Sequence, residues 1–169
     1  MKKKNLVLHL VLGAMVAAMY VALVGIFQWS SFAAVQFRIA EALTVLPALF
    51  GAAIPGVSVG CLLANLLWSP AGWLDWILGP IATLLAAGMT HWLGRRKWSF
   101  WLAPIPPIVV NAIIIGIALT GVQTDGTDAA PMLLNIATVG AGQAVVCFGL
   151  GLPLLLALRN LPFLKKLRK

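Results

Sequence analysis

The chain has 169 residues, of which 62% are hydrophobic and 9% are charged, and its mean hydropathy is +1.00. A soluble domain carries about 25% charged residues, so this composition excludes a soluble globular protein and predicts an integral membrane protein. The net charge of +8 does not indicate a nucleic-acid partner, because the basic residues do not spread along a face. All of them except Arg38 fall in three clusters, Lys2–Lys4, Arg95–Lys97 and Arg159–Lys169, which is typical of cytoplasmic ends of membrane spans.

Apolar runs separated by Gly, Pro and polar residues predict an all-α membrane protein with a single domain over residues 1–169. The first run, Leu6–Phe27, is longer than the apolar region of a secretory signal peptide, about 7–15 residues, and is expected to cross the bilayer. A tight turn is expected at Ile54–Gly56. The six predicted transmembrane helices cover residues 6–27, 36–53, 56–68, 73–93, 101–120 and 131–158.

The basic clusters give an independent test of this count, because Lys and Arg near membrane spans favour the cytoplasmic side. Four crossings before Arg95 and two after Lys97 place both termini and this loop in the cytoplasm. Five crossings would put the loop outside, against the charge bias. We therefore expect a multi-pass protein of the bacterial cytoplasmic membrane with cytoplasmic N- and C-termini.

Polar side chains within the predicted spans favour the outer half of the bilayer, which suggests a polar pocket that opens outward. Two alternatives, in which these residues have only a structural role, stay open. Arg38 and Glu41 could neutralise each other as an i,i+3 ion pair, and the amides could be hydrogen-bonding links between helices. Asn135 and Gln143 lie within about 80° of one another on the last helix and could line one cavity. The candidate pocket residues are Arg38, Glu41, Asn65, Asp75, Asn111, Asn135 and Gln143.

Three tryptophans, Trp68, Trp73 and Trp76, crowd around Asp75 at the external loop. Each could belong to the aromatic belt of a membrane protein. Alternatively, at least one of them could stack on a flat ligand.

Small residues form a face on the first helix, at Gly13, Ala14, Ala17 and Ala18. Such small-xxx-small pairs let another helix approach closely. The face could bind a partner protein, or it could pack inside this same bundle.

The sequence contains no phosphate-binding loop, no Cys/His metal spacing and no nucleophile beside a plausible base. We therefore expect no enzymatic activity, no cofactor, no metal site and no ability to hydrolyse ATP.

The segments Gln36–Pro47 and Ala53–Leu66 resemble the QueT family, the queuosine-precursor-specific S components of energy-coupling factor (ECF) transporters. The resemblance extends over most of the chain through its size, its helix count and residues 75–87. It implies an ECF S-component-like bundle that binds a 7-deazaguanine, such as 7-aminomethyl-7-deazaguanine (pre-queuosine-1), on the external side. It also implies association with a transmembrane coupling subunit (T component) and two ATPase subunits.

Within this resemblance the family motif carries onto Gln36, Arg38, Glu41 and Asn65, and the AxxxA face typical of S components matches Ala14 and Ala18. Our hypothesis is that Glu41 accepts hydrogen bonds from the guanine-like edge of the ligand. A second hypothesis assigns the aminomethyl ammonium to Asp75, with a neighbouring tryptophan over the ring face.

Three other functions are weighed against this one: an S component for another vitamin-like molecule, a self-contained small carrier or channel, and an assembly protein. The absence of an internal repeat and of a continuous polar path speaks against the carrier. An assembly protein would leave Glu41 without a role.

Overall fold

The computed structural model describes residues 3–31, 37–96, 100–123, 129–162 and 164, and every regular element within these residues is a helix. Two of the elements, η1 and η2, are 3₁₀ helices, and η3 is a π-helix. In chain order the elements are α1 Lys3–Ile26, α2 Gln28–Ser31, η1 Ile39–Ala48, α3 Ala53–Trp68, α4 Trp73–Arg95, η2 Phe100–Leu102, α5 Ile105–Gln123, α6 Ala129–Val146, η3 Cys147–Gly151 and α7 Leu152–Leu158.

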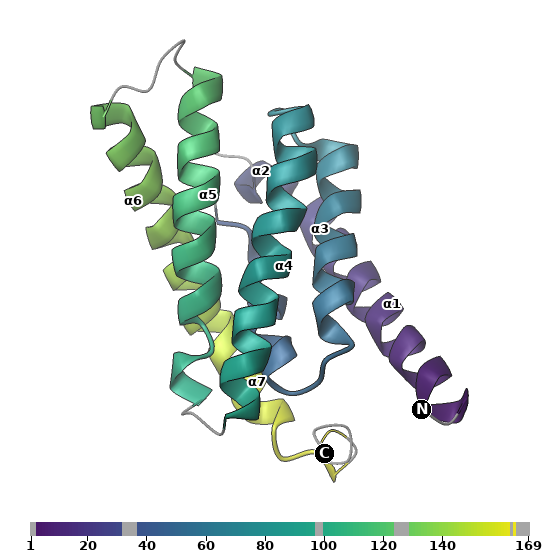
Figure 1. Cartoon of the computed structure of the whole chain (residues 1–169). Coiled ribbons are helices and arrows are strands. Elements are labelled where there is room, and N and C mark those ends of the chain that lie inside the picture. Colours follow the sequence, from purple (N-terminus) through teal and green to yellow (C-terminus); the bar gives the residue numbers. More distant parts are fainter. Residues whose placement is uncertain (1–2, 32–36, 97–99, 124–128, 163, 165–169) are drawn as a thin grey trace.

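The long helices form a bundle in which α1, α3, α4, α5 and α6 follow one another as packed neighbours (Figure 1). The helices α1, α3 and α5 run in one direction, and η1, α4 and α6 run in the other. Element η1 contacts α1, α3, α4, α5, α6, η3 and α7, so it lies at the centre of the bundle. The start of α1, the end of α4 and the end of α7 lie at the same end of the bundle.

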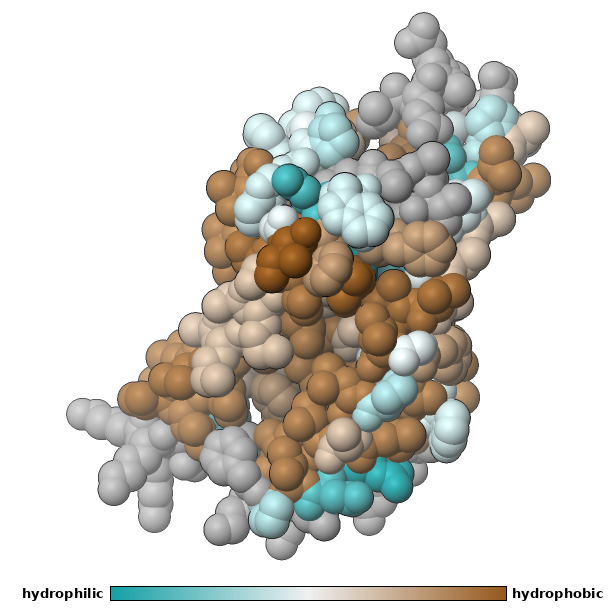
Figure 2. Space-filling model, turned by 180° about the vertical axis from the view of Figure 1, so that it is seen from behind, coloured by the Kyte–Doolittle hydropathy of each residue, from teal (hydrophilic) through white to brown (hydrophobic). Residues whose placement is uncertain are grey.

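Four stretches of the described chain are long and apolar enough to cross a membrane, namely Leu6–Ile26, Trp73–Arg95, Phe100–Gly121 and Ala130–Leu158. The surface agrees with this assignment. Figure 2 shows apolar residues over the middle of the molecule, with hydrophilic residues toward its two ends. Large apolar side chains such as Leu10, Leu67 and Leu134 are exposed, as expected for side chains that face lipid.

Element η1 differs from the expected α-helix over residues 36–53. It is a ten-residue 3₁₀ helix, and at about 2.0 Å of rise per residue it is shorter than a full membrane span. Every residue from Ala40 to Ala48 is buried, since other helices surround η1 on all sides. Together with the 16-residue α3, η1 falls outside the four membrane-spanning candidates, so the six-crossing topology stays a prediction.

The expected turn at Ile54–Gly56 is wrong, because α3 begins at Ala53 and these residues form its first turn. Pro55 is tolerated there because the first amide groups of a helix have no hydrogen-bonding partner within it. Gly56 lets α1 and α3 approach closely. A Cβ at position 56 would lie 2.7 Å from the carbonyl oxygen of Gly13.

Candidate functional site

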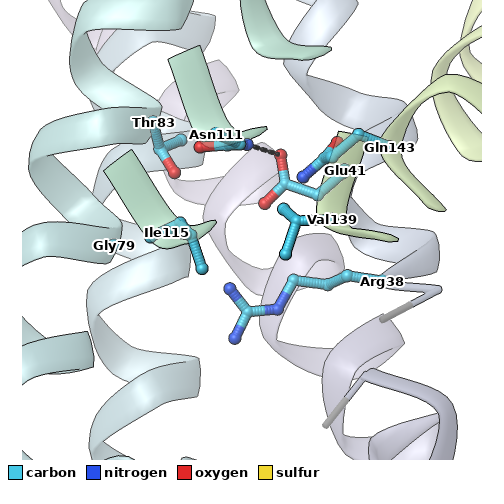
Figure 3. Close-up of a pocket in the computed structure, with 8 residues that line it drawn as sticks. All are labelled: Arg38, Glu41, Gly79, Thr83, Asn111, Ile115, Val139 and Gln143. Atoms are coloured by element: carbon cyan, nitrogen blue, oxygen red, sulfur yellow. Dashed lines mark hydrogen bonds between the residues drawn. The ribbon is translucent and has the colours of Figure 1, made fainter. Parts of the chain in front are cut away.

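A small polar cavity lies inside the bundle, between η1, α4, α5 and α6 (Figure 3). Its volume is about 10 Å³, which is room for about one water molecule. Polar side chains from η1, α4, α5 and α6 meet around it. The lining residues are Arg38, Glu41, Gly79, Thr83, Asn111, Ile115, Val139 and Gln143.

Glu41 is 1% exposed, and side chains from several helices, Gln143 of α6 among them, hydrogen-bond to its carboxylate. The hydroxyl of Tyr20 in α1 donates to its Oε1, and Nδ2 of Asn111 in α5 donates to its Oε2 over 3.2 Å. An ionised carboxylate offers about four acceptor positions. The donors Tyr20, Asn111 and Gln143 therefore leave room for at least about one further donor.

Arg38 is buried beside Glu41, and its partners come from α3 and α4. Its Nη2 donates to Oδ1 of Asn65 over 2.5 Å and lies 3.8 Å from Oδ2 of Asp75, with which it forms an ion pair. Ser69 donates to the same Asp75 oxygen over 2.6 Å. The guanidinium thus connects η1 to the start of α4.

The Asn65 amide completes this connection, since its Nδ2 donates to the backbone oxygen of Asp75 over 2.8 Å. Gly79 makes room for the amide. A Cβ at position 79 would lie 2.3 Å from Nδ2 of Asn65 and 3.3 Å from Oδ1 of Asp75. A larger residue at position 79 would force these groups apart.

The 3₁₀ geometry of η1 places its polar residues on one line. A 3₁₀ helix has three residues per turn, so side chains at i and i+3 align along the axis. Arg38 is the N-cap of η1, and Glu41 and Thr44 follow at intervals of three residues. The Thr44 hydroxyl donates to the Glu41 carbonyl oxygen over 2.6 Å. The spacing therefore directs two charged side chains toward the same cavity.

Four of the predicted pocket residues, Arg38, Glu41, Asn111 and Gln143, line the cavity, and Asn65 and Asp75 bind Arg38. Asn135 does not belong to this group, since its Nδ2 donates to Oγ1 of Thr120 over 3.0 Å and connects α6 to α5. Gln36 lies outside the described residues.

None of the three predicted tryptophans is among the residues that line the described cavity. The Trp68 ring packs against Gly25 of α1, where a Cβ would approach it to 2.8 Å. Trp73 and Trp76 are 64% and 38% exposed. Their positions in the first turn of α4 agree with the aromatic-belt alternative.

The sequence did not predict the hydrogen bond of Tyr20 to Glu41, nor the lining residues Gly79, Thr83, Ile115 and Val139. A signal for Tyr20 existed. It is the only tyrosine in the chain, and it places one phenolic hydroxyl within an otherwise apolar run. A buried tyrosine hydroxyl usually has a hydrogen-bonding partner. The sequence therefore predicts a polar neighbour for Tyr20.

The small-residue face of α1 is partly buried in the bundle and partly exposed on its surface. Gly13 and Ala17 are buried, the latter 8% exposed, whereas Ala14 and Ala18 are exposed. A nearly apolar groove of about 170 Å³ runs between α1 and the start of α3. Its lining residues are His9, Leu10, Gly13, Ala14, Ala17, Pro55, Gly56 and Val59. Part of the face thus packs within the bundle, and part of it lies on the surface.

An apolar exterior and a small internal polar cavity define a helical membrane protein. Within the described residues, no group of three or more His, Cys, Asp and Glu side chains could hold a metal ion.

The family model described as QueT transporter matches residues 10–160, so the chain belongs to the QueT transporter family. This match confirms the resemblance seen in the sequence. The protein is therefore a membrane transport protein. Comparison with curated proteins and with solved structures gives no match.

Proposed function

We propose that this protein is the substrate-binding S component of an ECF transporter, and that it captures a queuosine precursor at the outer face of the bacterial cytoplasmic membrane. The precursor is a 7-deazaguanine such as 7-aminomethyl-7-deazaguanine. The observation that supports this most directly is Glu41, a buried carboxylate that faces a polar cavity in a member of the QueT transporter family. A carboxylate at this depth is costly and usually functional.

The chemistry of a 7-deazaguanine complements the groups around this cavity. Its N1–H and exocyclic amine are neighbouring donors, and a carboxylate can accept both as a bidentate pair. Glu41 keeps acceptor capacity beyond its bonds to Tyr20, Asn111 and Gln143. Asn111 and Gln143 supply further amide donors and acceptors at the cavity. In this proposal Glu41 is therefore the group that recognises the guanine-like edge.

Asp75 is proposed to lie near the aminomethyl end of the ligand. Its Oδ2 is bound by Ser69 and paired with Arg38. Its Oδ1 lies near Gly79, which lines the cavity. An ammonium at this edge of the cavity would share the carboxylate with Arg38. In this proposal Glu41 binds the guanine-like edge of the ligand, and Asp75 binds its aminomethyl end.

The cavity must enlarge to admit such a ligand. Small-molecule pockets have volumes of about 300–1,000 Å³, and this cavity has about 10 Å³. Binding in this proposal therefore includes an outward displacement of helices around Glu41.

Import also needs an energy source, and the sequence carries no phosphate-binding loop. We propose that a transmembrane coupling subunit and two ATPase subunits supply it. The exposed Ala14 and Ala18 are the proposed contact with the coupling subunit, because small side chains permit close helix approach.

The test is a calorimetric titration of the purified, detergent-solubilised chain with 7-aminomethyl-7-deazaguanine, with guanine as the matched control. We expect saturable binding of the deazaguanine and at least about tenfold weaker binding of guanine, whose ring N7 replaces the substituted carbon. Binding of another vitamin-like molecule in place of the deazaguanine would favour the alternative S component. Uptake into vesicles that contain this chain alone would favour the self-contained carrier.

A further inference from the structure

Tyr20 is a buried polar residue to which the proposed binding chemistry gives no role. It lies in α1, is 0% exposed and donates its hydroxyl hydrogen to Oε1 of Glu41. Its helix contributes no residue to the lining of the cavity. The hydrogen bond therefore connects the carboxylate to an element outside the site.

The two oxygens of Glu41 are held from different helices. Tyr20 of α1 holds Oε1, and Asn111 of α5 holds Oε2. The terminal torsion of a glutamate is broad, so rotation of the carboxylate plane meets little intrinsic resistance. Two donors, one on each oxygen, restrict that rotation.

Packing between helices holds the Tyr20 ring in place. A Cβ at Gly60 would lie 2.7 Å from the Tyr20 Cβ, so α1 and α3 are in close contact at this level. Val16 and Val24, one turn to either side of Tyr20, are buried in the same core. The position of the hydroxyl is thus determined by packing between α1 and α3.

We infer that Tyr20 is a positioning residue that fixes the plane of the Glu41 carboxylate, so that both oxygens meet two neighbouring donors on one edge of the ligand. This inference rests on the proposed function. Tyr20 acts through Glu41 and needs no contact with the ligand. It determines whether the site distinguishes a two-donor edge from a one-donor edge.

The inference has a specific consequence for selectivity. A ligand with two donors needs both oxygens in its plane at once, whereas a ligand with one donor can follow a rotated carboxylate. Loss of the Tyr20 hydroxyl should therefore weaken the two-donor ligand more than the one-donor ligand. General damage to the fold would weaken both equally.

The test compares the wild type with Tyr20→Phe in titrations with 7-deazaguanine and with 7-deazahypoxanthine, which lacks the exocyclic amine. We expect the affinity for 7-deazaguanine to fall about tenfold or more, and that for 7-deazahypoxanthine to fall less than about threefold. Ser58→Ala is the matched control, because it also removes a hydroxyl, one that donates to the Ile54 carbonyl oxygen of α3 itself. Equal losses for both ligands, or no loss, would overturn the inference. Failure of the wild type to bind either deazaguanine would instead overturn the proposed function.

A second measurement needs no change at Tyr20. Since the chain contains one tyrosine, labelling with ¹³Cζ-tyrosine gives one NMR signal, which reports on this hydroxyl alone. We expect the signal of the wild type to shift when 7-deazaguanine binds, and the signal of unliganded Glu41→Gln to differ from that of the unliganded wild type. A signal that responds to neither change would contradict the inference, even if Tyr20→Phe did not fold.

Discussion

Arg38 and Glu41 are buried within the bundle, and the Asp75 side chain is 13% exposed. Each of the three is bound by residues from other elements. The ion pair between Arg38 and Asp75 offsets two of the charges. Glu41 is held by the neutral donors Tyr20 and Asn111. With Glu41 ionised, the three groups together carry one negative charge, which suits a ligand with one positive charge.

Replacing Glu41 by Gln tests this residue directly. The substitution keeps the shape of the side chain but exchanges one acceptor for a donor. Because a buried donor of the ligand would then lack its partner, we expect the affinity for 7-aminomethyl-7-deazaguanine to fall by about 2 kcal/mol or more, roughly 30-fold. Isothermal titration calorimetry measures the change.

Asn135→Ala provides the comparison for this measurement. It also removes a polar side chain from within the bundle, but one that bonds to Thr120. We expect its affinity to stay within about threefold of the wild type. An unchanged affinity in Glu41→Gln would remove Glu41 from the site, and a large loss in Asn135→Ala would return Asn135 to it.

Depth along a helix predicted only that polar side chains favour the outer half of the bilayer, and it placed Asn111 and Gln143 closer to the midplane than Arg38 and Glu41. The structure brings these four side chains to one cavity. Angle alone grouped Asn135 with Gln143, yet eight residues separate them by about 12 Å along the axis. The contact between Tyr20 and Glu41 could not be predicted, because an apolar helix gives no sign of which of its faces meets a carboxylate.

At the scale of elements, η1 shows where a sequence pattern stops being informative. Helices and strands are recognised from the spacing of apolar residues, and this spacing carries no information where a segment is buried on all sides. Ala40–Ala48 is such a segment. The 3₁₀ geometry that aligns Arg38 with Glu41 comes from the surrounding helices, so the sequence alone did not predict it.

The division of the α1 face predicts opposite effects for neighbouring alanines. Ala14→Trp adds a bulky side chain at an exposed position and should prevent the coupling subunit from approaching. We expect co-purification of the ATPase subunits and uptake to be lost, with ligand binding by the isolated subunit intact. Affinity purification of the complex and calorimetry of the subunit measure the two effects.

Ala17→Trp is the control, because Ala17 is buried and its backbone oxygen approaches Gly60 of α3. Overpacking there typically costs about 1–3 kcal/mol, so its thermal unfolding midpoint should fall. If Ala14→Trp lost ligand binding together with the complex, the whole face would be internal packing.

At the scale of the whole molecule, the fold brings the described residues of the three basic clusters to one end. The start of α1, the end of α4 and the end of α7 lie together there (Figure 1). Arg95 and Arg96 lie at the end of α4, and Arg159 follows α7. This arrangement supports the prediction that both termini are cytoplasmic.

Cysteine labelling in intact cells tests this topology. The native Cys61 and Cys147 are buried, so an impermeant maleimide should react slowly with them. We expect Ala71→Cys, between α3 and α4, to be labelled from outside. Arg96→Cys should react only after the membrane is permeabilised. Labelling of Arg96→Cys in sealed cells would contradict the six-crossing topology.

The small volume of the closed cavity also has a kinetic consequence. If helices must part before a ligand reaches Glu41, the rate of capture at high ligand concentration cannot exceed the rate of that opening, and it levels off there. Collective motions of this kind take about microseconds to milliseconds. The apparent dissociation constant is the intrinsic one divided by the fraction of molecules that are open. Asn65 and Asn111 hydrogen-bond the elements around the cavity to one another. We therefore expect these residues to govern how quickly the protein captures its ligand as well as how tightly it binds.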